Sequence, residues 1–180
     1  MNATLPPLPA LKSLGELAER LPTVVIDSRE QAPLPITRLP VIRAGLYSGD
    51  YGIAGLPDFA IERKSISDLV GCCVASSRER FENELHRLRG FQFKRLLIVG
   101  TREEIERGEY KSKITPAAVL GTLAAFEIRY DIPVVWTATP EEGARRVETW
   151  AWYAAREAVE TVNNVFRKSA MPAPATAGDH

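Results

Sequence analysis

The chain has 180 residues, of which 45% are hydrophobic, and this is enough for one folded domain with a substantial core. Its 23 basic and 23 acidic residues cancel, and zero net charge argues against a protein that coats nucleic acid through bulk electrostatics. The only histidines are His86 and His180, which excludes zinc fingers and histidine-based hydrolase sites, so any metal must be held by oxygen ligands.

Composition divides the chain into three parts. Residues 1–22 are rich in Pro and Leu and are expected to form an arm, with a short amphipathic helix from Leu11 to Leu21. Residues 23–162 are predicted to form a single domain, and the Ala- and Pro-rich residues 163–180 a disordered tail. Because the chain shows neither an apolar run of about 18 residues nor a signal-peptide pattern, we expect a cytoplasmic protein without a membrane partner.

The first predicted strand, residues 23–26, is an apolar run of the buried type, and it places Asp27, Arg29 and Glu30 at its end. Strand ends are where α/β folds usually place their sites, although the same three charges would also suit a surface turn. Residues 31–47 continue as a proline-rich irregular loop, followed by extended segments that lead toward a hairpin.

That hairpin is predicted to bring Asp50 opposite Glu62. The turn-forming Gly-Leu-Pro at residues 55–57 separates two extended segments, and a turn centred on its Leu places the two carboxylates across from each other in an antiparallel ladder. Since side chains alternate along a strand, Lys64 should lie on the same face as Glu62 and Arg63 on the opposite face.

Two carboxylates in this position repel each other, because opposed Cβ atoms are only about 5 Å apart. A sequence that needed only a stable hairpin would avoid the pair, but a divalent cation between Asp50 and Glu62 removes the repulsion. Hard cations such as Mg²⁺ take one or two carboxylates, keep several waters and bind substrate phosphate through the remaining positions. The pair therefore predicts the metal arrangement that phosphodiester hydrolysis requires.

The remaining segments alternate between helix and strand. Ser65 and Asp68 have the spacing of a capping box, and the apolar run that follows contains two adjacent cysteines, which are expected to be reduced core residues. Helical and strand patterns then follow in chain order: helix 78–88, strand 95–100, helix 116–130, strand 132–136 and helix 140–162. Strand, helix and strand at this spacing favour parallel crossovers and hence an α/β fold.

Several of these motifs together resemble a known family. Gly49-Asp50, followed by Glu62-Arg63-Lys64 and Asp68, is similar to the GD…ERK…D signature of the XPF-type structure-specific endonucleases, which belong to the restriction-endonuclease-like superfamily. Residues 25–30 resemble that family's first motif, and residues 77–81 its following helix. The resemblance implies a restriction-endonuclease-like mixed central sheet flanked by helices, with residues 23–162 as the nuclease domain.

The resemblance also implies an activity, that of a metal-dependent DNA endonuclease which hydrolyses phosphodiester bonds in branched DNA such as flaps, forks or junctions. Asp27, Asp50 and Glu62 would hold Mg²⁺ or Mn²⁺, which would lower the pKa of a bound water and stabilise charge on the phosphate. Lys64 would orient or polarise that water. Arg63 would fix the strand or a phosphate.

Other residues are expected to support this centre. The candidates for phosphate contacts that position DNA without reading its sequence are Arg29, Arg63 and Arg80. Glu30 is assigned a supporting role, and Asp68 is expected to act mainly as a helix cap. The family carries Gln four residues after the arginine at Arg80, whereas this chain has Glu84, which departs from the motif.

A partner and two other functions are open at this point. Family members commonly pair, and the apolar helical segments at residues 119–126 and 147–153 offer surface for a homodimer or a heteromeric partner. The chain could instead be a catalytically silent DNA-binding scaffold subunit, against which Asp50, Glu62 and Lys64 argue. It could also be a restriction-type nuclease of the same fold, although no base-reading residues stand out.

Overall fold

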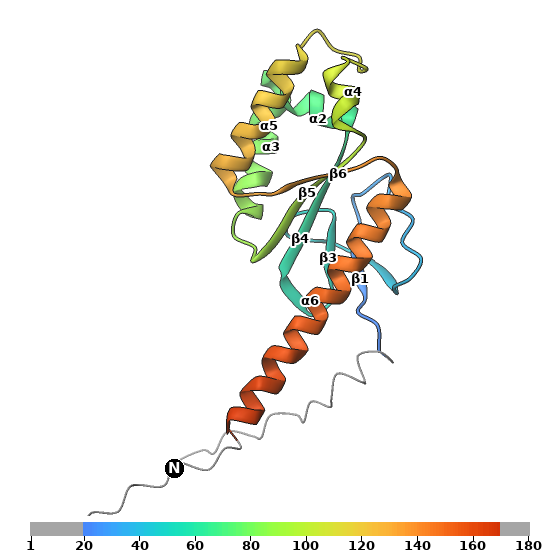
Figure 1. The fold of residues 1–180 in the computed structure, drawn as a ribbon, viewed down its shortest axis with the longest axis vertical. Coiled ribbons are helices and arrows are strands. Elements are labelled where there is room, and N and C mark those ends of the chain that lie inside the picture. The colour runs from blue at the N-terminus through green and yellow to red at the C-terminus, as the bar shows by residue number, and fades with distance from the viewer. Residues whose placement is uncertain (1–19, 170–180) are drawn as a thin grey trace, which may run out of the picture.

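The computed structural model describes residues 20–169, and these residues form a six-stranded sheet flanked by helices (Figure 1). The sheet order is β2-β1-β3-β4-β5-β6. The strands are β1 (Val24–Asp27), β2 (Val41–Ala44), β3 (Tyr51–Ile53), β4 (Leu56–Ser65), β5 (Phe93–Val99) and β6 (Val134–Thr137). The helices are α2 (Ile66–Cys72), α3 (Ala75–Leu88), α4 (Arg102–Glu106), α5 (Pro116–Tyr130) and α6 (Pro140–Ser169).

The sheet is mixed, which confirms the predicted α/β class. β4, β5 and β6 are parallel neighbours, and β1 is parallel to β2, whereas β3 is antiparallel to both β1 and β4. β5 lies inside the parallel half, where both faces of a strand are covered. This explains why three successive residues of its apolar run, Leu96, Leu97 and Ile98, are at most 1% exposed.

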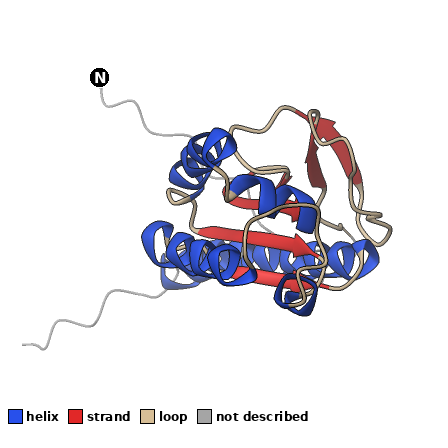
Figure 2. Cartoon of the chain, turned by 90° about the horizontal axis from the view of Figure 1, so that it is seen from above, coloured by secondary structure: helices blue, strands red, loops and turns tan. Residues whose placement is uncertain are grey.

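Helices pack on both faces of the sheet (Figure 2). One face, with Ala60, Leu96 and Ile98, is covered by apolar side chains of α2, α3 and α5. The other face, with Ile61 and Leu97, is covered by α6 and by the loop between β1 and β2. Consecutive residues of β4 therefore enter different cores, and this alternation decides where each charged residue at the end of β4 points.

Most predicted elements are present, and α5 begins and ends at the predicted residues. Three details were wrong. Residues 41–44 form the edge strand β2 beside β1 instead of running into the hairpin, because Gly45 to Asp50 form a loop. α3 begins at Ala75, with Val74 at its N-cap, so neither serine that follows caps it. Helix α4 was not predicted, although Thr101 and Glu104 form its capping box.

The C-terminal boundary also needs correction. α6 continues to Ser169, so residues 163–169 are helical instead of belonging to the predicted tail (Figure 1). The sequence from Pro140 to Ser169 has no proline after its first residue, and Arg156 pairs with Glu160 one turn later, so nothing stops the helix at Val162. The predicted arm helix and the end of the predicted tail lie largely outside the described residues.

No helix within residues 20–169 is both long enough and apolar enough to cross a membrane. The two cysteines, Cys72 and Cys73, are free, as predicted, and Cys73 is buried.

One buried carboxylate joins α6 to the loop between β1 and β2. Glu148 is 2% exposed, and its Oε1 accepts hydrogen bonds from the backbone N–H groups of Thr37 at 2.8 Å and Arg38 at 2.5 Å. Its Oε2 accepts from Nε of Arg38 at 2.6 Å. The loop supplies core residues Leu34 and Leu39, so this one side chain holds part of the second core in place.

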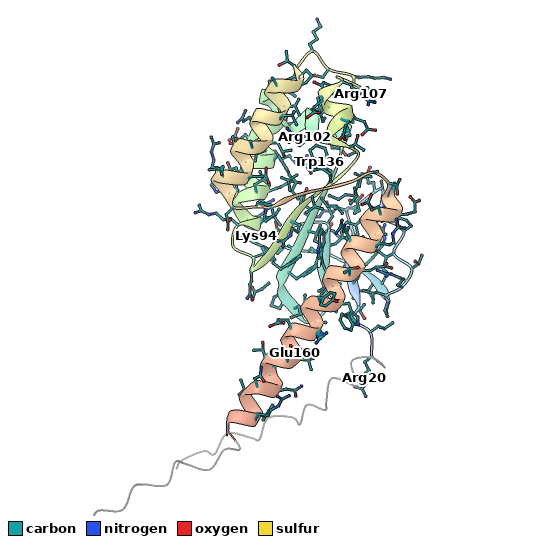
Figure 3. All side chains as sticks on the ribbon, viewed as in Figure 1. Arg20, Lys94, Arg102, Arg107, Trp136 and Glu160 are labelled. Atoms are coloured by element: carbon teal, nitrogen blue, oxygen red, sulfur yellow. The ribbon has the colours of Figure 1, made fainter. Side chains whose placement is uncertain are left out.

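We therefore expect Glu148→Ala to lower the free energy of unfolding by about 2–4 kcal/mol, because it leaves two backbone donors and a guanidinium without their acceptor. Urea unfolding measures this change. The matched control is Glu160→Ala on the same helix, where Glu160 pairs with Arg156 on the part of α6 that extends past the sheet (Figure 3). Loss of that exposed pair should lower the free energy of unfolding by no more than about 0.5 kcal/mol. Equal losses in both variants would contradict the assigned role of Glu148.

Candidate active site

The site forms where the loop before β3, the C-terminal half of β4 and helix α3 meet. In the β3–β4 ladder Tyr51 pairs with Ile61, which is the predicted register, and the next position outward places Asp50 beside Glu62. The turn itself was misplaced: Ile53 pairs with Leu56, so the turn is at Ala54 and Gly55. A register shift between the two pairs restores the predicted alignment.

Two hydrogen bonds hold Asp50 against β4. Its N–H donates to the carbonyl of Ile61 at 2.8 Å, and its Oδ2 accepts from the N–H of Arg63 at 2.7 Å. The preceding Gly49 has φ +80°, and a Cβ atom there would lie 3.0 Å from the Ile61 carbonyl oxygen. Glycine therefore meets two requirements here, a left-handed backbone and close approach to β4.

Glu62 and Lys64 lie on the same face of β4, as predicted. Glu62 is 5% exposed, and its Oε1 accepts a hydrogen bond from Nζ of Lys64 at 2.5 Å. The ammonium of Lys64 also lies 3.6 Å from Oε2 of Glu84 and 4.9 Å from the centre of the Phe81 ring, both on α3. Helix α3 thus fixes the position of the cation beside the carboxylate.

The two carboxylates resist ionisation in the metal-free protein. Burial raises the pKa of Glu62, and the negative charge of Asp50 raises it further. Burial likewise raises the pKa of Asp50, against the opposing effect of the Arg63 N–H. Burial disfavours the charge on Lys64, but its attraction to Glu62 and its hydrogen bond with Glu62 outweigh this, and the pKa of Lys64 is raised. The Lys64 ammonium therefore does not offset the burial and mutual repulsion of the two carboxylates.

Asp27 occupies the neighbouring strand, but its oxygens are already engaged. Its N–H donates to the Asp50 carbonyl at 2.9 Å. Its carboxylate accepts from Arg29 through N–H at 2.7 Å, Nε at 2.8 Å and Nη2 at 3.0 Å, and from the N–H of Leu46 at 2.7 Å. The side-chain bond to Arg29 holds the pKa of Asp27 well below its usual range. Asp27 thus anchors the start of the loop that carries Asp50.

Arg63 points to the opposite face, as predicted, and pairs there with Glu30. Its Nε and Nη2 each lie 3.2 Å from the Glu30 carboxylate, and Glu30 is only 7% exposed. The pair ties the end of β4 to the turn after β1. The guanidinium is therefore committed to a protein carboxylate, which is different from an open phosphate contact.

The other predicted residues divide between capping and open surface. Asp68 caps α2, because its N–H donates to Ser65 Oγ at 3.1 Å and its Oδ2 accepts from that hydroxyl at 2.7 Å. Arg29 and Arg80 are exposed, with side-chain accessibilities of 73% and 88%. Arg29 stays bonded to Asp27, and Arg80 lies 3.8 Å from Glu84, but both guanidinium groups are open to solvent.

Two residues near the site were not singled out by sequence reasoning. Glu84 was noted only as a departure from the family motif, yet it supplies the second carboxylate around Lys64. Ser48 is 5% exposed, and within the described residues its Oγ is the one buried side-chain oxygen or nitrogen without a hydrogen-bond partner. A serine in a loop gives no sequence signal for such a position. Glu84 did give a signal, because it lies four residues after Arg80, where the family motif has Gln.

The donor set of the site fits a hard divalent cation held by two carboxylates. The hydrogen bonds engage Oδ2 of Asp50 and Oε1 of Glu62, and within residues 20–169 the second oxygen of each carboxylate accepts none. A cation placed there would also offset the burial and repulsion that raise both pKa values. In the described part of the chain, no three His, Cys, Asp or Glu side chains are arranged to hold a metal, and metal binding by Asp27 stays a prediction.

The family model of the ERCC4 domain matches residues 26–149. The fold is similar to XPF from Aeropyrum pernix, with 21% identity and a TM-score of 0.60 over 79% of this chain and 69% of that one. XPF from the same organism in complex with DNA matches with 22% identity and a TM-score of 0.57, over 76% and 66% of the two chains.

No curated protein sequence matches the chain. The two solved structures establish the fold, and the family model spans both the Asp50 loop and the whole of β4 and α3. Since that match covers more than half of the sequence, the chain belongs to the ERCC4 domain family, the nuclease-domain family of the XPF-type endonucleases that its motifs resemble.

Proposed function

We propose that the protein is a divalent-metal-dependent endonuclease that hydrolyses phosphodiester bonds in DNA, with branched DNA as its preferred substrate. The observation that supports this best is the group of Asp50, Glu62 and Lys64. A half-buried Asp50, held by backbone hydrogen bonds, lies beside the buried Glu62, and one ammonium is fixed next to Glu62. Without a cation this arrangement lowers the stability of the folded protein, whereas with a bound cation it can serve catalysis.

Asp50 and Glu62 would hold Mg²⁺ or Mn²⁺ through the oxygens that accept no hydrogen bond. When bound, the metal supplies a water of lowered pKa and stabilises charge on the scissile phosphate. Lys64, held between Glu62 and Glu84, orients or polarises the attacking water from a fixed position. Its two carboxylate neighbours keep the ammonium protonated, so it acts through charge and hydrogen bonding and does not serve as a base.

The surrounding residues would position strand and substrate. Arg63 and Glu30 brace the end of β4 from the opposite face, and Asp27 keeps the Asp50 loop in place through Leu46. For Asp27 to ligate the metal itself, its carboxylate would first have to release Arg29. Arg29 and Arg80 are exposed on either side and suit contacts to DNA phosphates, which position the substrate without reading sequence.

Preference for branched DNA follows from charge and size. With zero net charge, the protein gains little affinity from the phosphate backbone of a plain duplex. Discrimination then depends on shape and on single-stranded parts that reach a local site. A catalytically silent scaffold subunit would need the same fold but no functional pair of carboxylates, so activity separates the two functions.

A cleavage panel tests the proposal directly. With Mg²⁺ or Mn²⁺, the full chain should cleave flap, fork or four-way DNA faster than linear duplex of the same length, and binding should weaken as salt rises. EDTA should abolish cleavage. No cleavage of any substrate, with binding intact, would favour the scaffold function. Equal rates on linear and branched DNA would contradict the preference for branches.

Asp50→Asn and Glu62→Gln should each abolish cleavage, since each removes the charge of one proposed metal ligand while preserving size. DNA binding and cooperative unfolding should be retained. The control is Glu157→Gln, because Glu157 is an exposed carboxylate on α6, and its neutralisation should leave the cleavage rate unchanged. Metal titration of all three variants gives the direct readout. Wild-type cleavage by Asp50→Asn or Glu62→Gln would refute the ligand assignment.

Metal-free stability provides a second test of the same pair. Carboxylates whose folded-state pKa is raised contribute their full stability at low pH, and this is lost as the pH rises through the folded pKa. Without metal, Asp50→Asn should therefore exceed the parent in stability by about 0.2–1 kcal/mol at pH 8, and the difference should vanish near pH 4. The Asn side chain can still accept the Arg63 N–H, so the loop stays anchored.

Thermal melts with and without Mg²⁺ check this expectation. Added Mg²⁺ should stabilise the parent but not Asp50→Asn, so the parent should then have the higher melting temperature. Glu157→Gln should follow the parent in both conditions. Marked destabilisation of Asp50→Asn without metal would show that the carboxylate serves the fold and not a cation.

A further inference from the structure

A second hollow lies beside the candidate site and has no role in the chemistry above. Its volume is about 510 Å³, and it is lined by Tyr47, Pro57, Asp58, His86, Arg87, Gly90 and Phe91. These residues come from the loop before β3, the start of β4, and the C-terminal end of α3 with the turn after it. The same loop, strand and helix carry Asp50, Glu62 and Glu84, so the hollow and the site share one structural frame.

The geometry of α3 places the two regions in line. Arg80, Glu84 and Arg87 recur at spacings of four and three residues, so they lie on one side of the helix. Glu84 contacts Lys64 at the centre of this row, Arg80 lines a pocket with Lys64 at one end, and Arg87 lines the hollow at the other. At 1.5 Å per residue the row from Arg80 to Arg87 is about 10 Å long.

The lining carries the groups that bind a nucleobase. Tyr47 is 79% exposed and Phe91 is partly buried, so two aromatic rings border the space. Asp58 and Arg87 both line it, and within residues 20–169 neither forms an ion pair. One free acceptor, one free cation and flat apolar rings suit an unstacked base with its phosphate. A continuous apolar lining would have suited a protein helix instead.

We propose that this hollow, the Tyr47 pocket, accepts an unstacked base of a single-stranded segment of the DNA bound at the candidate site. Tyr47 provides the stacking surface, and Arg87 contacts the adjacent phosphate. Stacking on aromatic side chains tolerates any base, since every base has a π-face, so the pocket recognises single strands without reading sequence. This inference rests on the proposed function for its location beside the chemistry, and it identifies a source of the branched-DNA preference that net charge does not supply.

Binding to a short single-stranded oligonucleotide that contains a fluorescent adenine analogue tests the pocket, with EDTA present so that cleavage does not interfere. Tyr47→Ala should weaken binding by about 5- to 100-fold and abolish the quenching that stacking causes. Tyr47→Phe should keep both within about 2-fold, because the ring remains. The matched control is Tyr153→Ala, because Tyr153 is also exposed, at 59%, but lies on α6. This variant should change neither the affinity nor the quenching.

Arg87 gives an independent readout. Arg87→Ala should reduce the slope of log affinity against log salt by about 0.7 for the single strand, which corresponds to the loss of one phosphate contact. Affinity for blunt duplex should not change in the Tyr47 variants. Unchanged single-strand binding in Tyr47→Ala would overturn the assignment. An equal loss of affinity for blunt duplex in this variant would overturn it as well.

The outcomes separate this inference from the proposed function. Oligonucleotide binding that depends on Tyr47, in a protein that cleaves no DNA with any metal, would leave the pocket established and reject the nuclease. Metal-dependent cleavage of forks with no dependence on Tyr47 would reject the pocket and keep the nuclease. The full chain is used in every arm.

Discussion

The hydrogen bond from the Arg63 N–H to Oδ2 of Asp50 is the contact on which the site depends. It uses a backbone donor of β4 to hold a carboxylate that the strand would otherwise repel through Glu62. The close approach of Gly49 makes this bond possible, since any side chain there would meet the Ile61 carbonyl. A loop residue is thus held against β4, and the half-buried Asp50 remains adjacent to the buried Glu62.

Alternation along β4 sorts the charges around that bond. Glu62 and Lys64 face the core covered by α2, α3 and α5, while Arg63 faces the core covered by α6. Arg63 is paired there with Glu30, and its charge lowers the pKa of Asp50 by less than burial raises it. The carboxylate pair therefore resists ionisation on its own face, and we propose that a divalent cation binds there and favours the ionised form.

Sequence patterns predicted the parts of this structure that depend on local rules. α5 was placed correctly because Thr115 caps it, Pro116 opens it and Asp131 ends it in a left-handed conformation. The Asp50–Glu62 register was right although the turn was not, because a shift within the hairpin compensated for the misplaced turn. α4 carried a readable capping box that was overlooked.

Contacts between distant segments could not be read in this way. Glu148 joins residues more than a hundred positions apart, and no local pattern in α6 distinguishes it from the exposed acids beside it. Asp27 shows the same limit at short range: its position at a strand end suggested a ligand, but only the folded loop reveals that Leu46 and Arg29 already satisfy it. The motif residues therefore share a location at one end of the sheet. The role of each one depends on the neighbouring groups that it contacts in the folded protein. Within residues 20–169, Asp50 and Glu62 form no ion pair with an arginine side chain, and unlike Asp68 neither caps a helix, which is why we propose these two acids as the metal ligands.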